Sequence, residues 1–218
     1  MPKTAWLFDV DGTLVDTVAI HIVAYRAAYQ LVTEKIIPDN VIASRFGMPA
    51  TKGHDLVFSA IKIPFSQKTI DAVVVEHQRF FAEESKKHKI VPLNGVVDFL
   101  VALQKQNVCL GVVTGNFEVP ASNILKNAGL LGFFPVIGCD SGHDDRVSIV
   151  KRTVVIMQRK FSCDKIIVVG DTPSDVRAGK AAKTKTVAVA SGSFSVSSLK
   201  KEKPDVVVKS LKDYPAIM

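Results

Sequence analysis

The chain has 218 residues, of which 47% are hydrophobic and 22% are charged, and its formal net charge is +7. This composition can bury a substantial core, which excludes a disordered or fibrous protein, and no apolar run approaches the roughly 20 residues of a membrane-spanning helix. The N-terminal segment does not have the pattern of a signal peptide. Three cysteines without a Cys-x-x-Cys pair argue against a disulfide framework or a zinc ribbon. We therefore expect a cytoplasmic protein with one large domain, or one domain with an insertion.

The positive net charge favours anionic substrates, because the summed field of the protein attracts them. The densest basic stretches, residues 86–89 and 200–203, contain no aromatic residues. A solvated surface is the simpler interpretation of such stretches, since nucleic-acid-binding surfaces usually combine basic and aromatic side chains. We expect neither a nucleic-acid partner nor a membrane partner.

Short apolar runs rich in β-branched residues recur along the chain. Their apolar character is continuous rather than alternating, which predicts strands that are buried on both faces, as in a parallel sheet. The predicted strands are Ala5–Val10, Val108–Val113, Val136–Cys139, Ile166–Val169, Thr186–Val189 and Val206–Val208.

Helical patterns separate these strands from Val91 onward. They cover Gly95–Lys105, Val119–Ala128 and Val147–Lys160. Strands that alternate with helices of this length predict an α/β fold with a doubly wound, Rossmann-like parallel sheet.

The segment between the first two predicted strands is different, because it shows only helical periodicity. It is interrupted at Pro38, at residues 47–49 and at Ile63-Pro64. A βαβ crossover needs only about 30 residues, so this segment is too long to be one. We predict an all-helical inserted domain over residues 17–91, within a core domain formed by residues 1–16 and 92–218.

Two aspartates, Asp9 and Asp11, lie at the end of the first predicted strand and are followed by Gly12. Ligands of open α/β sheets bind beyond the carboxyl ends of strands. Carboxylates this close repel each other, and a hard cation with oxygen ligands such as Mg²⁺ relieves the repulsion. The alternative is an Asp-Gly turn that closes the strand, with Asp9 solvated.

Two further strand ends carry polar residues. Thr114, Gly115 and Asn116 precede a helix, where they form either a phosphate cradle or an ordinary helix-entry loop. Asp171 follows the fourth predicted strand and would complete a carboxylate cluster. Asp175 would form a capping box with Thr172 and could serve the cluster as well.

These residues resemble the motifs of the haloacid dehalogenase-like hydrolases, in the branch that contains phosphoglycolate phosphatases and phosphoglucomutases. Residues 9–13 match the opening motif Asp-x-Asp-Gly-Thr, residues 114–116 resemble the second motif and residues 170–175 resemble the fourth. The third motif, a lysine or arginine, is represented by Arg146 or Lys151. We prefer Arg146, although the lysine-proline context of many relatives is missing. The resemblance covers nearly the whole chain, and it implies that the helical insertion is a cap.

The resemblance implies a Mg²⁺-dependent phosphatase that hydrolyses a small phosphorylated metabolite through an aspartyl-phosphate. Asp9 would be the nucleophile and Asp11 the general acid and base. The implied metal ligands are Asp9, Asp11 through its main-chain carbonyl, Asp171 and, in support, Asp175. The implied phosphate-binding residues are Gly12, Thr114, Gly115, Asn116, Arg146 and Lys151.

Two other functions fit the same residues. A phosphosugar mutase of this family uses the same pair of aspartates, and a non-catalytic binding protein could use the same fold. In the predicted cap, Arg45, Met48 and Lys52 flank Gly47, either as substrate contacts or as an ordinary linker. The five histidines show no metal-ligand spacing, so none is assigned as a ligand.

Overall fold

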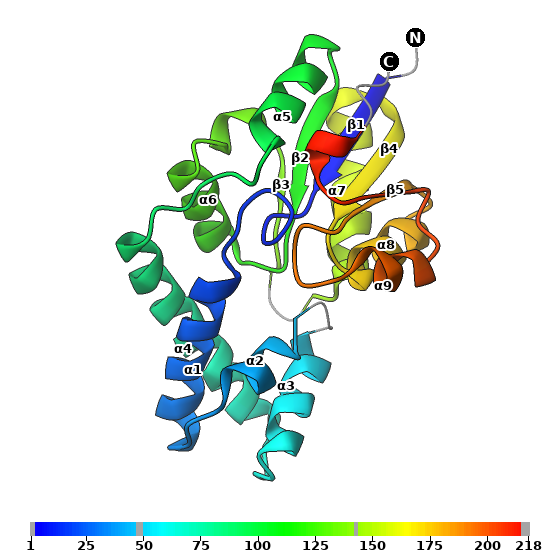
Figure 1. Ribbon diagram of the computed structural model, residues 1–218. Helices are drawn as coiled ribbons and strands as arrows, with labels where there is room; N and C mark the ends of the chain where they lie inside the picture. The colour runs from blue at the N-terminus through cyan, green and yellow to red at the C-terminus, as the bar shows by residue number, and fades with distance from the viewer. Residues whose placement is uncertain (1–2, 47–49, 142–143, 215–218) are drawn as a thin grey trace. The chain divides into compact units, whose positions relative to one another are not determined.

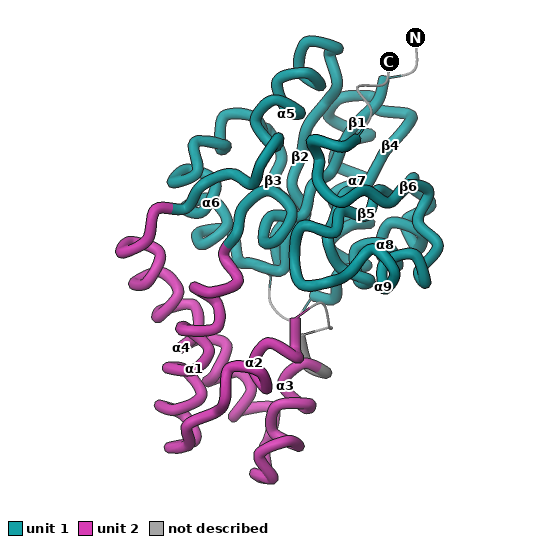
Figure 2. Tube along the Cα trace, viewed as in Figure 1, with its two compact units in different colours: residues 1–16, 90–218 teal, residues 17–89 magenta. Residues whose placement is uncertain are grey.

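The computed structural model of the chain describes residues 3–46, 50–141 and 144–214 (Figure 1). Gly47, Met48 and His143 therefore lie outside the described residues, and the side chain of Lys52 is not described. The chain divides into two compact units, residues 1–16 with 90–218 and residues 17–89 (Figure 2). We call them the core unit and the helical unit.

Six parallel strands form the sheet of the core unit, in the order β3-β2-β1-β4-β5-β6. This confirms the predicted parallel sheet and makes β1 a central strand. The strands are β1 (Lys3–Phe8), β2 (Cys109–Val113), β3 (Ile137–Gly138), β4 (Cys163–Gly170), β5 (Lys185–Val189) and β6 (Val206–Val208).

Five of the six strands have a boundary that differs from the predicted one, and β2 and β5 differ by only one residue at the start. β1 ends at Phe8 rather than Val10, because the carbonyl of Val10 accepts hydrogen bonds from the amides of residues 14 and 15 and the chain turns there. β4 begins earlier than predicted, at Cys163, because its first residues pair with the start of β1. β3 keeps only Ile137–Gly138 of the predicted Val136–Cys139.

The core unit's helices alternate with its strands, as a doubly wound fold requires. They are α5 (Val96–Lys105), α6 (Glu118–Asn127), α7 (Arg146–Phe161), α8 (Pro173–Ala181) and α9 (Val196–Lys201), with short 3₁₀ turns at Leu131–Phe133 and Leu211–Asp213. Across both units, no helix in the described ranges has the length and apolar character needed to cross a bilayer.

Strand β1 is buried on both faces because successive side chains point to opposite sides of the sheet. On one face, the ring centroids of Trp6 and Phe8 lie 5.3 Å and 6.2 Å from that of Phe99 in α5. On the other face, Ala5 and Leu7 belong to an apolar cluster that includes residues of α7. This double burial explains the continuous apolar run and leaves the carboxyl end of β1 as the point where polar residues can emerge.

The described part of the helical unit forms the helices α1 (Val18–Thr33), α2 (Asp39–Ala43), α3 (Ala50–Ala60) and α4 (Gln67–Lys87). Pro38 directly precedes α2, and Ile63-Pro64 lies between α3 and α4, so both sequence signals mark helix boundaries. Ser66 begins α4 with a capping box. The apolar core of the unit consists of Tyr25, Ala28, Tyr29, Ile37, Ile42, Val57, Phe58, Ile70 and Val73.

Polar rings accompany this apolar core. His21 Nδ1 lies 3.1 Å from His77 Nε2, and His77 stacks on Tyr25 with ring centroids 3.6 Å apart. His54 Nδ1 lies 2.8 Å from the Tyr29 hydroxyl. Burial lowers the pKa of His54 to about 3 and places the pKa of His77 well below its ordinary value; nearby cationic groups reinforce both shifts. Both histidines are therefore neutral in the folded unit.

Acidification is expected to destabilise the helical unit. Unfolded histidine titrates near pH 6.5, so between that pH and about 3 the unfolded chain binds more protons than the folded one, and stability falls as pH falls. Proton linkage makes the free energy of unfolding fall by about 1.4 kcal/mol per pH unit for each histidine in this range. Hydrogen exchange of α1 and α4, corrected for intrinsic rates, should show less protection at pH 5 than at pH 7. His54→Gln should reduce this pH dependence and His88→Gln, at an exposed site, should not; equal protection at both pH values would contradict the expectation.

Candidate active site

The polar residues of the site lie at the carboxyl ends of neighbouring strands. Asp9 directly follows β1, Asp171 follows β4 and Thr114 follows β2. Because β1 pairs in parallel with both β2 and β4, these three ends meet at one edge of the sheet. The sheet order thus brings together residues that are far apart in the sequence.

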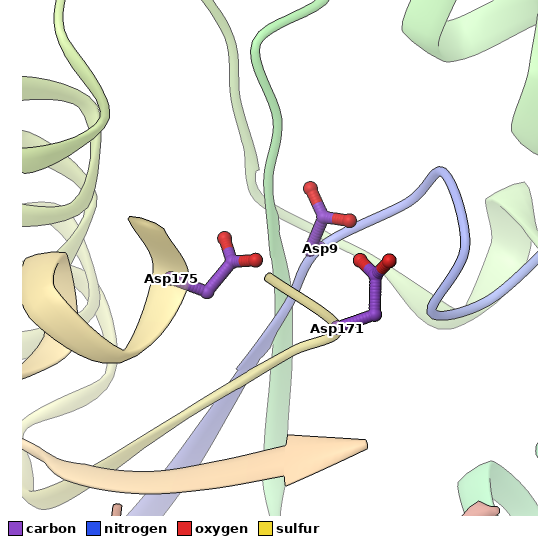
Figure 3. Close-up of side chains that lie close together, drawn as sticks. All are labelled: Asp9, Asp171 and Asp175. Carbon is purple, nitrogen blue, oxygen red and sulfur yellow. The ribbon is translucent and has the colours of Figure 1, made fainter. Parts of the chain in front are cut away.

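Asp9, Asp171 and Asp175 form a buried carboxylate cluster (Figure 3). Each offers one oxygen, and these oxygens all lie within 4.8 Å of one another. The three residues are only 2%, 4% and 1% exposed. Carboxylates this close and this far from water repel one another unless a cation or a proton intervenes.

A hydroxyl and two glycines hold the cluster together. Thr13 Oγ1 lies 3.3 Å from Asp9 Oδ2 and 3.2 Å from Asp171 Oδ1, so one hydroxyl bridges the two carboxylates. Gly12 has a φ of +85°, and a Cβ there would lie 2.5 Å from Asp171 Oδ2. A Cβ at Gly192 would overlap Asp171 as well. The chain can therefore close around Asp171 only where side chains are absent.

Arg146, the first residue of α7, supplies the positive charge of the cluster. Its Nη2 donates to Asp9 Oδ1 at 2.6 Å, its Nη1 donates to the carbonyl of Val113 at 3.0 Å, and its Nε lies 3.2 Å from Asp175 Oδ1. Asp145 caps α7 by accepting from the amide of Ser148, which fixes the start of the helix. Three ionised carboxylates and one guanidinium leave a formal charge of −2.

Burial and the excess of negative charge both raise the pKa values of two of the clustered carboxyl groups. Burial raises the pKa of Asp9 to about 7; the Arg146 guanidinium opposes the shift, and the charges of Asp175 and Asp11 add to it. Burial, followed by the charges of Asp9 and Asp175, raises the pKa of Asp171 well above its ordinary value. The cluster therefore favours binding of additional positive charge.

A divalent cation with a preference for oxygen ligands fits this donor set. Asp175 Oδ1 is buried and accepts no hydrogen bond within the described ranges, although it forms an ion pair with Arg146 Nε at 3.2 Å, so it retains capacity to accept from or coordinate a further partner. A charge of +2 would balance the formal charge of −2. Carboxylate oxygens are the ligands that Mg²⁺ and Ca²⁺ prefer, and the residues present therefore fit such an ion.

Asp175 both caps α8 and lies in the carboxylate cluster. Its Oδ2 accepts from the Thr172 amide at 3.1 Å and from the Thr172 hydroxyl at 2.6 Å, and the Asp175 amide bonds back to that hydroxyl. This is the predicted capping box at the start of α8. Because the cap uses Oδ2, Oδ1 can face Arg146 and the cluster.

Asp11 points its carboxylate to a different neighbour. Asp11 Oδ2 accepts from Asn116 Nδ2 at 2.5 Å, and the same amide group lies 3.2 Å from Thr114 Oγ1. The Asn116 backbone amide also donates to Thr114 Oγ1, at 3.1 Å. The Asp11 carboxylate is thus not among the three clustered carboxylates, and it is oriented by the loop after β2.

Two of the predicted phosphate-binding residues are placed differently from the others. Lys151 lies on α7 with an exposed side chain, while Arg146 contacts the cluster. A Cβ at Gly115 would meet no atom within 4 Å, so no contact within the described residues requires glycine there. The structure brings Gly12, Thr114, Asn116 and Arg146 to the edge of the sheet that carries Asp9.

Ser191 and Gly192 also contact the site, although no sequence motif marks them. Ser191 Oγ donates to the carbonyl of Gly12 at 2.7 Å and ties the loop after β5 to the loop after β1. Gly192 leaves the space that Asp171 fills. Their position, just after the predicted strand Thr186–Val189, is the sequence signal that could have identified them as site residues.

Curated relatives cover almost the full length of the chain. Pyrophosphatase PpaX of Listeria innocua is 28% identical over 220 residues, which span 99% of this chain and 96% of the relative. A phosphoglycolate phosphatase of Aquifex aeolicus is 28% identical over 184 residues, or 83% of this chain and 81% of the relative.

Solved structures share the fold. A predicted phosphoglycolate phosphatase from Haemophilus somnus superposes with a TM-score of 0.79 at 19% identity, covering 97% of this chain and 96% of the other. CbbY from Rhodobacter sphaeroides, solved in complex with phosphate, gives a TM-score of 0.78 at 15% identity, with coverage of 99% and 97%. A sequence model of the haloacid dehalogenase-like hydrolases matches residues 6–189, which include the clustered aspartates and Arg146. The chain belongs to this family of hydrolases.

Proposed function

We propose that the protein is a Mg²⁺-dependent phosphatase that transfers the phosphoryl group of a small phosphorylated metabolite to Asp9 and then to water. The observation that carries the proposal is the setting of Asp9. It stands at the end of the central strand, with Arg146 on one oxygen and the Thr13–Asp171 pair on the other. The names of the relatives, a pyrophosphatase and a phosphoglycolate phosphatase, support a small phosphorylated substrate.

Asp9 and Asp171 would hold the ion, with Asp175 beside them and the main-chain carbonyl of Asp11 as a further ligand. When bound, Mg²⁺ supplies positive charge to the oxygens of the phosphoryl group. It also offsets the mutual repulsion of the clustered carboxylates, which keeps Asp9 ionised and therefore nucleophilic.

The chemistry divides into two displacements at phosphorus. An oxygen of Asp9 bonds to phosphorus, the bond to the leaving oxygen breaks, and the Asp11 carboxyl group donates its proton to that oxygen. Water then bonds to phosphorus and gives a proton to the Asp11 carboxylate, while the bond between phosphorus and Asp9 breaks. Phosphate leaves, and both aspartates return to their starting states.

The other residues bind the phosphoryl group and orient the acid. The Thr114 hydroxyl, the Asn116 amide and the Arg146 guanidinium would donate to its oxygens. Asn116 also holds Asp11, which links phosphate binding to the position of the proton donor. The helical unit would act as a cap that admits substrate and excludes water, with Gly12 and the following loop as part of the hinge.

Replacement of the nucleophile should abolish turnover. Asp9→Asn keeps the shape of the side chain but cannot attack phosphorus, so kcat should fall by at least about a thousandfold. The measurement is phosphate release from an aryl phosphate with Mg²⁺, with circular dichroism to show that the fold is kept. Asp98→Asn, which changes an exposed aspartate of α5, serves as the control and should retain activity. Turnover by pure Asp9→Asn protein near the wild-type rate would remove Asp9 from this role.

Removal of divalent ions should stop catalysis. Mg²⁺ should restore activity after chelation, and Ca²⁺ should restore it poorly because its looser coordination suits in-line transfer less well. Asp171→Asn should raise the Mg²⁺ concentration for half-maximal activity by about tenfold or more, because it replaces an anionic ligand with a neutral one. Full activity in excess chelator would show that the aspartates serve another purpose.

The role of Asp11 can be separated by the choice of leaving group. General acid catalysis contributes about 10²–10⁴-fold, so Asp11→Asn should slow hydrolysis of alkyl phosphates by that factor. An aryl phosphate needs less protonation, and its first step should be slowed less. Pre-steady-state kinetics should show a burst of phenol. The variant also lacks the base that accepts a proton from the attacking water, so the second displacement becomes slow after the phenol has left. Equal slowing of both substrates without a burst would indicate that Asp11 only shapes the loop.

A phosphosugar mutase would give a different product pattern. It would return the phosphoryl group to the sugar instead of releasing it. A panel of phosphorylated metabolites, assayed for both inorganic phosphate and isomerised phosphosugar, distinguishes the two activities and ranks substrates by kcat/KM.

A further inference from the structure

The loop after β5 contacts the loop after β1 at Gly12, where the backbone has the rotational freedom of a glycine. Gly12 has a φ of +85°, a conformation that residues with side chains rarely adopt. It joins two peptide groups, one that carries the main-chain carbonyl of Asp11 and one that leads to Thr13. The backbone angles of Gly12 therefore set how a proposed metal ligand and the bridging Thr13 hydroxyl are directed toward the carboxylate cluster.

Hydrogen bonds restrain both of these peptide groups. The Gly12 amide donates to the carbonyl of Val15 at 2.7 Å. The Gly12 carbonyl accepts from Ser191 Oγ, also at 2.7 Å. The Thr13 amide, in the same peptide group as that carbonyl, reaches the carbonyl of Val10 at 3.3 Å. The bond from the Ser191 hydroxyl is therefore the shorter of the two that hold this peptide group.

The sheet holds Ser191 in place. Strand β5 pairs with β4 as far as Ala188, which lies opposite Gly170. The amide of Ala190 then donates to the carbonyl of Val208 in β6 at 2.9 Å. Ser191 follows directly, so its hydroxyl projects from a backbone that is bonded to strands on both sides.

The next residue, Gly192, brings the same loop against the other side of the cluster. A Cβ at Gly192 would overlap the Asp171 carboxylate, so the backbone passes close to that group. Asp171 follows β4, and Gly12 lies in the loop after β1. Two adjacent residues of the loop after β5 thus contact both loops that carry proposed metal ligands.

We propose that Ser191 is a positioning residue for the divalent cation. Its hydroxyl would hold Gly12 in the conformation that directs the Asp11 carbonyl and the Thr13 hydroxyl toward the cluster, so that the ion enters a preformed site. Without this hydroxyl the glycine rotates more freely, the loop must be ordered when the ion binds, and the affinity falls. Because this role presupposes a bound cation, it rests on the proposed function.

Direct binding of the ion tests the proposal without turnover. Ser191→Ala should weaken Mg²⁺ binding to the full chain by about tenfold, the loss typical when a group that orients a metal ligand is removed. Isothermal titration calorimetry measures Mg²⁺ binding, and the electron paramagnetic resonance signal of free Mn²⁺ gives an independent affinity. Ser193→Ala, which changes an exposed serine of the same loop, is the control and should bind as the wild type does. Equal Mg²⁺ affinity in Ser191→Ala and the wild type overturns the proposal.

The metal-free protein provides a readout of the loop itself. In ¹⁵N-labelled Ser191→Ala, the amides of Gly12 and Thr13 should exchange with solvent faster than in the wild type, while the amides of β1 keep their protection. Saturating Mg²⁺ should reduce this difference. Unchanged exchange at Gly12 and Thr13 would show that the hydroxyl does not restrain the loop.

Kinetics separate positioning from a general loss of structure. In Ser191→Ala the Mg²⁺ concentration for half-maximal activity should rise by about the same factor as the dissociation constant. The value of kcat at saturating Mg²⁺ should fall by a smaller factor, because the bound ion restores the order of the loop. A fall in kcat with an unchanged half-maximal Mg²⁺ concentration would overturn the assignment of Ser191 to the cation.

A failure of the proposed function gives a different result. If the wild-type chain binds neither Mg²⁺ nor Mn²⁺, the cation-dependent reaction and the role of Ser191 are both excluded. If the wild type binds these ions and Ser191→Ala binds them equally well, only the positioning role is overturned.

Discussion

Mutual repulsion among three buried carboxylates is the constraint on which the core unit depends. Asp9 and Asp171 end adjacent parallel strands, and Asp175 lies in the first turn of the helix that follows β4. The parallel sheet forces these groups together, because the carboxyl ends of its strands share one edge. Arg146 offsets part of the repulsion, the Thr13 hydroxyl bridges two of the groups, and the capping box occupies the remaining oxygen of Asp175. The negative charge that remains makes the edge suitable for a divalent cation, whose charge would in turn offset that of an anionic group bound beside it.

Space around the carboxylates is a second requirement, and small residues provide it. A Cβ at Gly170 would overlap Asp175, and one at Gly12 or Gly192 would collide with Asp171. Three strand-end loops can therefore approach the carboxylates closely and exclude water. The bond from Ser191 to the carbonyl of Gly12 joins two of these loops, so the loop after β5 helps to hold the loop after β1, although it carries none of the clustered aspartates.

Most of the fold could be predicted from local patterns, while several site contacts could not. Continuous apolar runs predicted the six strands, and Asp9 and Asp171 were expected to meet because both end strands of one parallel sheet. The bonds from Asn116 to Asp11 and from Ser191 to Gly12 join residues 105 and 179 positions apart, and only the folded loops define them.

Helix geometry distinguishes Arg146 from Lys151. Five positions along a helix correspond to about 7.5 Å and a rotation to another face, so only the first residue of α7 reaches Asp9.

The two units contain opposite charge imbalances, and the same physical rule governs both. In the core unit, carboxylates outnumber the guanidinium that faces them, and burial raises the pKa of Asp9 and Asp171. In the helical unit, Arg45 is buried among neutral rings with no carboxylate paired to it in the described ranges, and burial with this nearby charge lowers the pKa of His54. Burial disfavours net charge of either sign, and the two units meet this cost differently. A cation bound at the core unit's cluster would offset the excess of carboxylates, whereas in the helical unit the neutral rings of Tyr25 and His54 surround the Arg45 guanidinium.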